Sequence, residues 1–160
     1  MRGTALFIIT AALSCVATAR DLPTFDQFRV AEIYRGRPAN VRLGGHPDAK
    51  KFRTVLREGA RTGPNFAGHY TVVTFGCGTA CQRLMIVDAK SGSVFFPPQT
   101  QPNSYFMVTD ESPPFQFRVD SELLILTGAP MDKENEGVYY YRWTGQALRQ
   151  LAYVPRSWQR

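Results

Sequence analysis

The sequence predicts a mainly β (α+β) domain: an antiparallel meander sheet or sandwich of about seven strands with one N-terminal amphipathic helix. Three observations predict this class. The chain has 160 residues, of which 44% are hydrophobic and 20% charged, as expected for one globular domain with a core. One segment near the N-terminus has a helical period. The rest alternates short runs rich in Val, Ile, Tyr and Phe with Gly, Pro, Asn and Asp.

The first residues have the features of a secretory signal peptide. Arg2 supplies the positive charge, residues 5–16 form an apolar run, and residues 17–19, Ala-Thr-Ala, match a small-residue cleavage site. We therefore expect residues 1–19 to be removed and residues 20–160 to form a single periplasmic or secreted domain.

The N-terminal segment also bears on whether the protein is attached to a membrane. No apolar run reaches the roughly 20 residues that cross a bilayer, so we expect no transmembrane segment. A lipoprotein anchored through Cys15 is the alternative to a freely soluble exported domain. The lipobox match is poor, because Ala12 stands where leucine is usual.

The predicted helix covers residues 46–60. Pro47 suits a first helical turn, Asp48 lies near the positive end of the helix dipole, and the pair at residues 63–64, Gly-Pro, ends the segment. Its apolar stripe consists of Ala49, Phe52, Val55 and Leu56.

The same helix carries the sharpest charge feature of the chain. Cations recur at spacings of three and four, which predicts one exposed basic side formed by Lys50, Arg53, Arg57 and Arg61. Residues 20–61 hold ten basic and five acidic side chains, whereas residues 62–160 hold eight of each. This side is either a plain solvated face or a site for an anionic polymer or glycan; nucleic acid is not expected for an exported protein.

The strands are predicted from the run-and-turn pattern that follows the helix. They cover residues 69–76, 82–88, 93–97, 115–119, 122–127, 137–143 and 147–154. The first three and the last three have similar lengths and turns, which predicts two related antiparallel meanders. The proline-rich residues 97–115 between them predict a long loop, either a binding segment or a cover with a short edge strand at 105–106.

Cys77 and Cys81 are the only cysteines that the mature chain would retain, and export favours their pairing. The glycines around them permit the tight turn that a disulfide needs. A catalytic alternative uses His69 as base, Cys77 as nucleophile and Asp88 to orient the histidine. An extended strand would place His69 about 26 Å from Cys77, which disfavours this alternative.

We expect no metal and no cofactor. Spacing typical of a zinc site is missing from the candidate ligands His46, His69, Cys77 and Cys81. The acidic run 132–137 fails as a calcium loop because its twelfth position is Trp143, where a bidentate glutamate is required.

A second candidate binding surface lies in the segment 139–143, Tyr-Tyr-Tyr-Arg-Trp. Strand alternation sends Tyr139, Tyr141 and Trp143 to one face and Tyr140 with Arg142 to the other. Tyr140 and Arg142 could then contact a ligand or a protein partner, or simply pack across strands.

Residues 65–70, Asn-Phe-Ala-Gly-His-Tyr, followed by residues 76–81, Gly-Cys-Gly-Thr-Ala-Cys, resemble a group of small uncharacterised exported bacterial proteins. These proteins carry an N-F-A-G-H-Y segment and a G-C-G-T-x-C loop. The resemblance covers about residues 64–95 and implies an exported bacterial protein, without attaching an activity.

These features together predict a non-catalytic exported binding protein, such as an inhibitor or immunity-type partner of a cell-envelope enzyme. The expected partner is then an unidentified envelope or extracellular protein. Two alternatives remain open: an envelope enzyme using His69 and Cys77, and a module that binds an anionic polymer or glycan through Lys50, Arg53 and Arg57.

Overall fold

The computed structural model of the protein describes residues 22–105, 113–131 and 136–156. The predicted signal peptide, Cys15, Phe106 of the predicted edge strand and residues 132–135 of the acidic run lie outside these ranges. No helix in the described part of the chain is long and apolar enough to cross a membrane.

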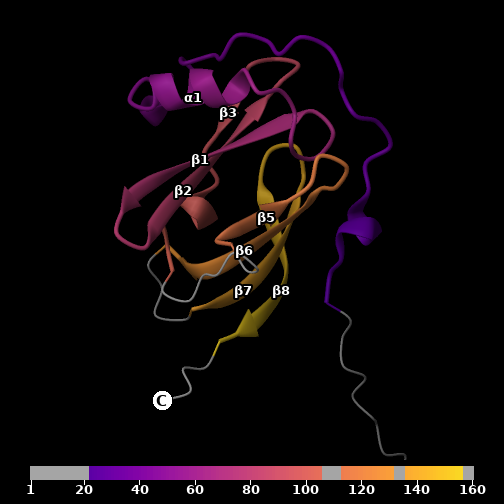
Figure 1. The fold of residues 1–160 in the computed structure, drawn as a ribbon, viewed down its shortest axis with the longest axis vertical. Helices are drawn as coiled ribbons and strands as arrows, with labels where there is room; N and C mark the ends of the chain where they lie inside the picture. Colours follow the sequence, from indigo (N-terminus) through magenta and orange to yellow (C-terminus); the bar gives the residue numbers. More distant parts are fainter. Residues whose placement is uncertain (1–21, 106–112, 132–135, 157–160) are drawn as a thin grey trace, which may run out of the picture.

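The fold is mainly β, as predicted: one open antiparallel sheet of eight strands (Figure 1). Its strand order is β1-β2-β4-β6-β7-β8, while β3 pairs with β2 and β5 pairs with β6. The strands are β1 (Tyr70–Gly78), β2 (Cys81–Asp88), β3 (Val94–Phe95), β4 (Asn103–Ser104), β5 (Phe115–Phe117), β6 (Leu123–Pro130), β7 (Gly137–Trp143) and β8 (Leu148–Pro155).

Two three-stranded meanders, β1-β2-β3 and β6-β7-β8, make up most of the sheet, as the repeat predicted. The short strand β4 joins them, since Ser104 pairs with Cys81 of β2 and with Ala129 of β6. The buried Asn103 side chain donates to the Thr127 carbonyl at 3.0 Å, which fixes β4 against β6. The predicted loop therefore contributes a central strand.

The N-terminal helix is shorter than predicted. Residues 46–60 contain a 3-10 turn, η2 (Pro47–Ala49), and then helix α1 (Arg53–Ala60). His46 Nδ1 accepts the Asp48 N–H at 3.2 Å and caps the turn. Phe52 separates the two pieces, with φ −98° and ψ 19°, and the centroid of its ring lies 4.6 Å from that of the Phe75 ring on β1.

The hairpin β1–β2 is buried on both faces. Leu84 and Ile86 belong to the larger core, which the hairpin shares with β6, β7 and β8. Met85 and Val87 point the other way, into a second core that α1 closes with Leu56 and Ala60. Figure 1 shows α1 lying over β1 and β2 at one end of the molecule. Helix α1 is thus packed firmly against one face of the hairpin.

The Asn-Phe-Ala-Gly-His-Tyr segment has a structural role. The Asn65 amide pairs with the Val72 backbone in both directions, at 2.7 and 3.1 Å, like a neighbouring strand. The Gly68 N–H donates to Val119 O at 2.7 Å, and its carbonyl accepts the Tyr34 N–H at 2.8 Å. The segment thus ties β1 to the N-terminal arm and to the turn before β6.

The predicted disulfide is present. Cys77 and Cys81 are bonded, with their Cα atoms 5.2 Å apart, at the tip of the β1–β2 hairpin. Residues 76–79 are exposed there. The bond therefore closes a protruding turn and does not cross-link distant parts of the fold.

Candidate functional site

The extended segment 37–42 forms one wall of the candidate site. The Ala39 N–H donates to Ala89 O at 2.8 Å, which anchors the segment beside the β2–β3 turn. Gly92 in that turn has φ +76°, and a Cβ atom there would overlap the carbonyl oxygen of Asn40. Only glycine allows the two backbones to approach this closely.

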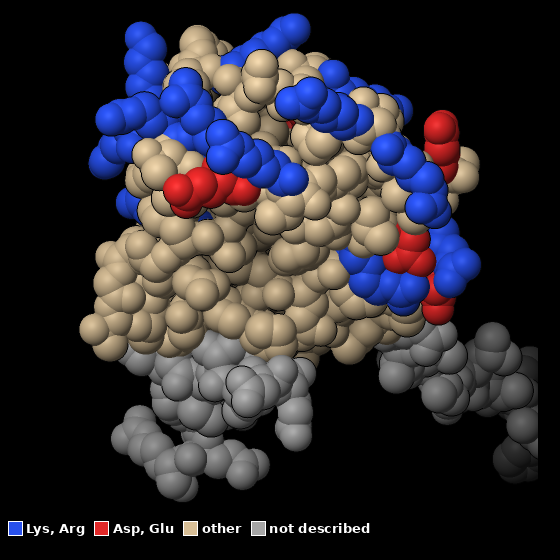
Figure 2. Space-filling model, turned by 45° about the horizontal axis from the view of Figure 1, so that its top comes forward, with Lys and Arg blue, Asp and Glu red and all other residues tan. Residues whose placement is uncertain are grey.

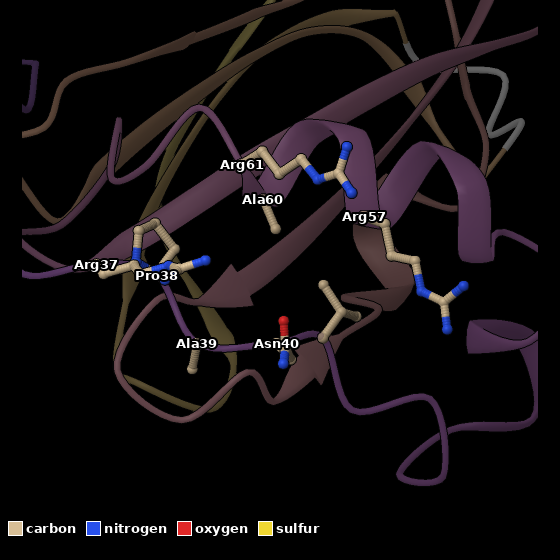
Figure 3. A pocket seen from close by; sticks show the side chains of 8 residues that line it. Arg37, Pro38, Ala39, Asn40, Arg57, Ala60 and Arg61 are labelled. Carbon is tan, nitrogen blue, oxygen red and sulfur yellow. The ribbon is translucent and has the colours of Figure 1, made fainter.

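The second wall is the last turn of α1. A cleft of about 630 Å³ separates it from the segment and is lined by Arg37, Pro38, Ala39, Asn40, Val41, Arg57, Ala60 and Arg61. Ala60 is buried and closes the cleft toward the core. In Figure 3, Arg57 and Arg61 extend from α1, and Arg37 and Asn40 come from the segment opposite. We call these lining residues the arginine cleft.

The electrostatics of the arginine cleft are one-sided. Arg37, Arg57 and Arg61 form no ion pair with any Asp or Glu in the described part of the chain. Residues 35–61 carry eight Lys or Arg against two Asp or Glu. Figure 2 shows the resulting concentration of blue side chains over the end of the molecule that holds α1. Three arginines that line one hollow and form no ion pair within the described residues give it a positive potential.

The structure divides the predicted basic side of the helix. Arg57 and Arg61 line the arginine cleft, whereas Lys50 and Arg53 are exposed and do not line it. Sequence reasoning missed Arg37 and Asn40, because their segment has no periodic pattern and its position depends on hydrogen bonds to the distant β2–β3 turn.

The predicted surface of Tyr140 and Arg142 has intramolecular partners. As predicted, Tyr139, Tyr141 and Trp143 are buried, and Tyr140 and Arg142 face the other way. Burial raises the pKa of both Tyr139 and Tyr141 to about 12. The Arg142 Nε donates to Glu122 Oε2 at 2.8 Å, and its guanidinium lies 5.9 Å from the centre of the Phe28 ring. Arg142 is therefore part of a cross-strand contact.

The alternative catalytic residues are only partly brought together. His69 Nε2 lies 4.0 Å from Asp88 Oδ1, and Asp88 also accepts the Ser91 hydroxyl at 2.7 Å. Cys77 is in the disulfide at the far end of β1, eight residues or roughly 26 Å from His69. His69 and Cys77 cannot act on one substrate atom in this fold.

A smaller hollow of about 410 Å³ adjoins His69 and includes Tyr70, Lys90, Glu122 and Trp143 in its wall. Burial lowers the pKa of His69; attraction to Asp88 opposes this shift and repulsion from Lys90 adds to it. The imidazole is therefore neutral at neutral pH. Burial raises the pKa of Tyr70, so this phenol keeps its proton. The hollow has mixed charge, unlike the arginine cleft.

Within the described ranges, no group of three or more His, Cys, Asp or Glu side chains is arranged to hold a metal ion. The arginine cleft, with three arginines in its lining, is the candidate site. Comparisons of the chain with protein-family models, with curated proteins and with solved structures find no match.

Proposed function

We propose that this protein is an exported, non-catalytic binding protein that holds an anionic polymer in the arginine cleft. One observation carries the proposal: three arginines from two separate segments line the same cleft, and none of them forms an ion pair with an acidic side chain among the residues that the structure describes. This is the anionic-polymer alternative of the sequence analysis, with Arg37 and Arg61 added and with Lys50 and Arg53 as exposed neighbours.

The chemistry of arginine supports an oxyanion as the ligand group. A guanidinium group offers a planar set of donors that matches carboxylate and phosphate oxygens in pairs. Arg57, Arg61 and Arg37 are exposed, so each contact with the ligand is screened by salt. A polymer that makes several such contacts at once gains affinity that a single small anion lacks.

Export is part of the proposal. The disulfide between Cys77 and Cys81 is consistent with an oxidising compartment, as is the predicted signal peptide. The resemblance to exported bacterial proteins favours the same location. Anionic polymers of the cell envelope are then the ligands that the protein would meet.

The proposal is tested by titrating the mature chain, residues 20–160, with inorganic polyphosphate in a calorimeter. Arg57→Glu should lower the affinity by about tenfold or more, because a charge-assisted contact is replaced by a repulsive one. Arg149→Glu makes the same change of charge at an exposed position on β8 and should leave affinity within about twofold. Equal losses in both variants, or an affinity that ignores salt, would contradict a specific cleft.

A protein partner, such as an envelope enzyme, is the second candidate. The observation that favours it is the exposed hairpin tip at residues 76–79, held rigid by the disulfide. Immobilised mature protein should then retain one envelope enzyme saturably, and Thr79→Arg at the tip should abolish retention while Arg149→Glu does not. Retention that Thr79→Arg leaves unchanged would count against this candidate.

A further inference from the structure

A pair of stacked rings joins residue 46, just before the turn η2, to residue 96, just after strand β3. The His46 and Phe96 rings are 4.1 Å apart between centroids and nearly parallel, at 21°. Both side chains are half-buried, and the Phe52 ring lies 6.4 Å from Phe96 behind them. We call the pair His46 and Phe96 the aromatic ridge.

Two hollows flank the aromatic ridge, and its two residues line both. The first, of about 670 Å³, includes Arg42 in its wall. The second, of about 470 Å³, includes Arg83 and Asp48. Each hollow therefore brings one arginine near the ridge.

Neither arginine is neutralised by an acidic side chain in the described part of the chain. Arg42 and Arg83 form no ion pair within the described residues, and this includes Asp48 beside Arg83. The Nε atom of Arg83 is buried and has no hydrogen-bond partner among the described residues. Arg83 lines the second hollow, so its guanidinium group is the candidate partner for an acidic group placed there.

His46 adds one more donor. Its Nδ1 accepts the Asp48 N–H, so in the neutral ring the proton is on Nε2. Nε2 makes no hydrogen bond within the described part of the chain. The aromatic ridge thus offers an apolar stacking face and an N–H donor between two arginines.

We propose that the aromatic ridge binds a linear acidic polysaccharide. A sugar ring would stack on the ridge, its hydroxyls would face His46 Nε2, and carboxylates on neighbouring sugars would pair with Arg42 and Arg83. The inference rests on the proposed function, since it names the chemical class of the anionic polymer. A charged chain without rings would use the arginine cleft but gain nothing from the ridge.

The position of the ridge agrees with one continuous ligand path. Residues 37–41 line the arginine cleft, and Arg42 with residues 44–46 continues the same segment into the first hollow. The two regions are therefore adjacent along the chain at Val41 and Arg42. A polymer that follows this segment would contact both.

The test compares polygalacturonate, a chain of acidic sugars, with polyphosphate, which has charge but no sugar ring. Phe96→Leu keeps an apolar side chain and removes the ring. It should weaken polygalacturonate binding by about tenfold and leave polyphosphate binding unchanged. Arg83→Gln should also weaken polygalacturonate binding, and it serves as a second variant should Phe96→Leu fail to fold. Thermal unfolding of each variant establishes that it is folded.

The possible results separate the two proposals. In one result, the wild type binds polyphosphate but not polygalacturonate; in another, it binds polygalacturonate with the same affinity as Phe96→Leu and Arg83→Gln. Either result would overturn the proposed role of the aromatic ridge and leave that of the arginine cleft unchanged. Binding of neither polymer by the wild type would overturn both. Loss of affinity for both polymers in a folded Phe96→Leu would also overturn the ridge, because the effect would not depend on sugar rings.

Discussion

Gly92 decides how closely segment 37–42 approaches the sheet. Its φ of +76° lies in the left-handed region, and its Cα faces the carbonyl of Asn40 without room for a side chain. The Arg42 N–H donates to the Gly92 carbonyl at 2.8 Å. The geometry of the arginine cleft therefore depends on a residue that does not line it.

Gly92→Ala should destabilise the protein by at least about 2 kcal/mol, because the left-handed backbone and the overlap with Asn40 both oppose a Cβ atom. It should also weaken polyphosphate binding by moving the segment outward. Gly44→Ala is the control, since a Cβ there meets no atom within 4 Å. Urea denaturation measures both variants, and equal stability of the two would contradict the close approach.

His69 makes stability depend on pH. Its pKa is lowered in the folded state, chiefly by burial. As pH falls below about 6.5, the unfolded chain binds the proton first. The free energy of unfolding should therefore decrease below that pH and level off below the folded pKa, with no contribution from His69 above 6.5. His69→Gln should show a smaller loss between about pH 8 and pH 5 in urea denaturation. An unchanged or steeper loss would contradict the sign of the shift.

At the scale of elements, the β1–β2 hairpin has distinct roles at its two ends. Its open end meets the segment Asn-Phe-Ala-Gly-His-Tyr, and its closed end carries the disulfide. One face of the hairpin packs on α1, the helix that forms a wall of the arginine cleft. The disulfide lies outside this packing contact.

Replacing Cys77 and Cys81 with serine should cost about 2 kcal/mol, the chain-entropy value for so short a loop. Polyphosphate affinity should stay the same, because the arginine cleft does not include the tip. Thermal unfolding with and without reductant measures the effect. Reductant should lower the midpoint of thermal unfolding of the wild type and leave that of the double serine variant unchanged. A lower midpoint in both proteins would contradict the assignment of the effect to the disulfide.

The elements that the sequence predicted well are those with a strong local pattern. Strand β7 begins and ends as predicted because it is a run of β-branched and aromatic residues between turn residues. Strand β4 was missed because two residues, Asn103 and Ser104, carry no periodicity and pair through contacts distant in sequence. Arg57 was predicted from helical spacing, whereas Arg37 reaches the same cleft only through tertiary hydrogen bonds.

At the scale of the whole molecule, the two hydrophobic cores hold different parts of the fold together. The larger core, which includes Leu126, holds the two meanders together. The smaller core, which includes Leu56, holds α1 on the hairpin. Many of the cationic side chains lie over the end of the molecule that holds α1 (Figure 2). Stability and ligand binding should therefore be separable by mutation.

Leu56→Ala and Leu126→Ala should each cost about 2–5 kcal/mol, because both side chains are fully buried. Only Leu56→Ala should also weaken polyphosphate binding, since it loosens the helix that carries Arg57 and Arg61. Calorimetric titration at a temperature where both variants are folded measures the difference. Equal affinity in the two variants would contradict a binding role for the smaller core.

The most direct test of the arginine cleft is to observe arginine side chains during ligand binding. In NMR spectra of the nitrogen-15-labelled mature protein, polyphosphate should shift the Nε–H signals of Arg37, Arg57 and Arg61 together, with one saturation curve. The Nε–H signals of Arg118 and Arg149 should stay in place. Shifts spread over all arginines, or confined to Arg118 and Arg149, would contradict anion binding in the arginine cleft.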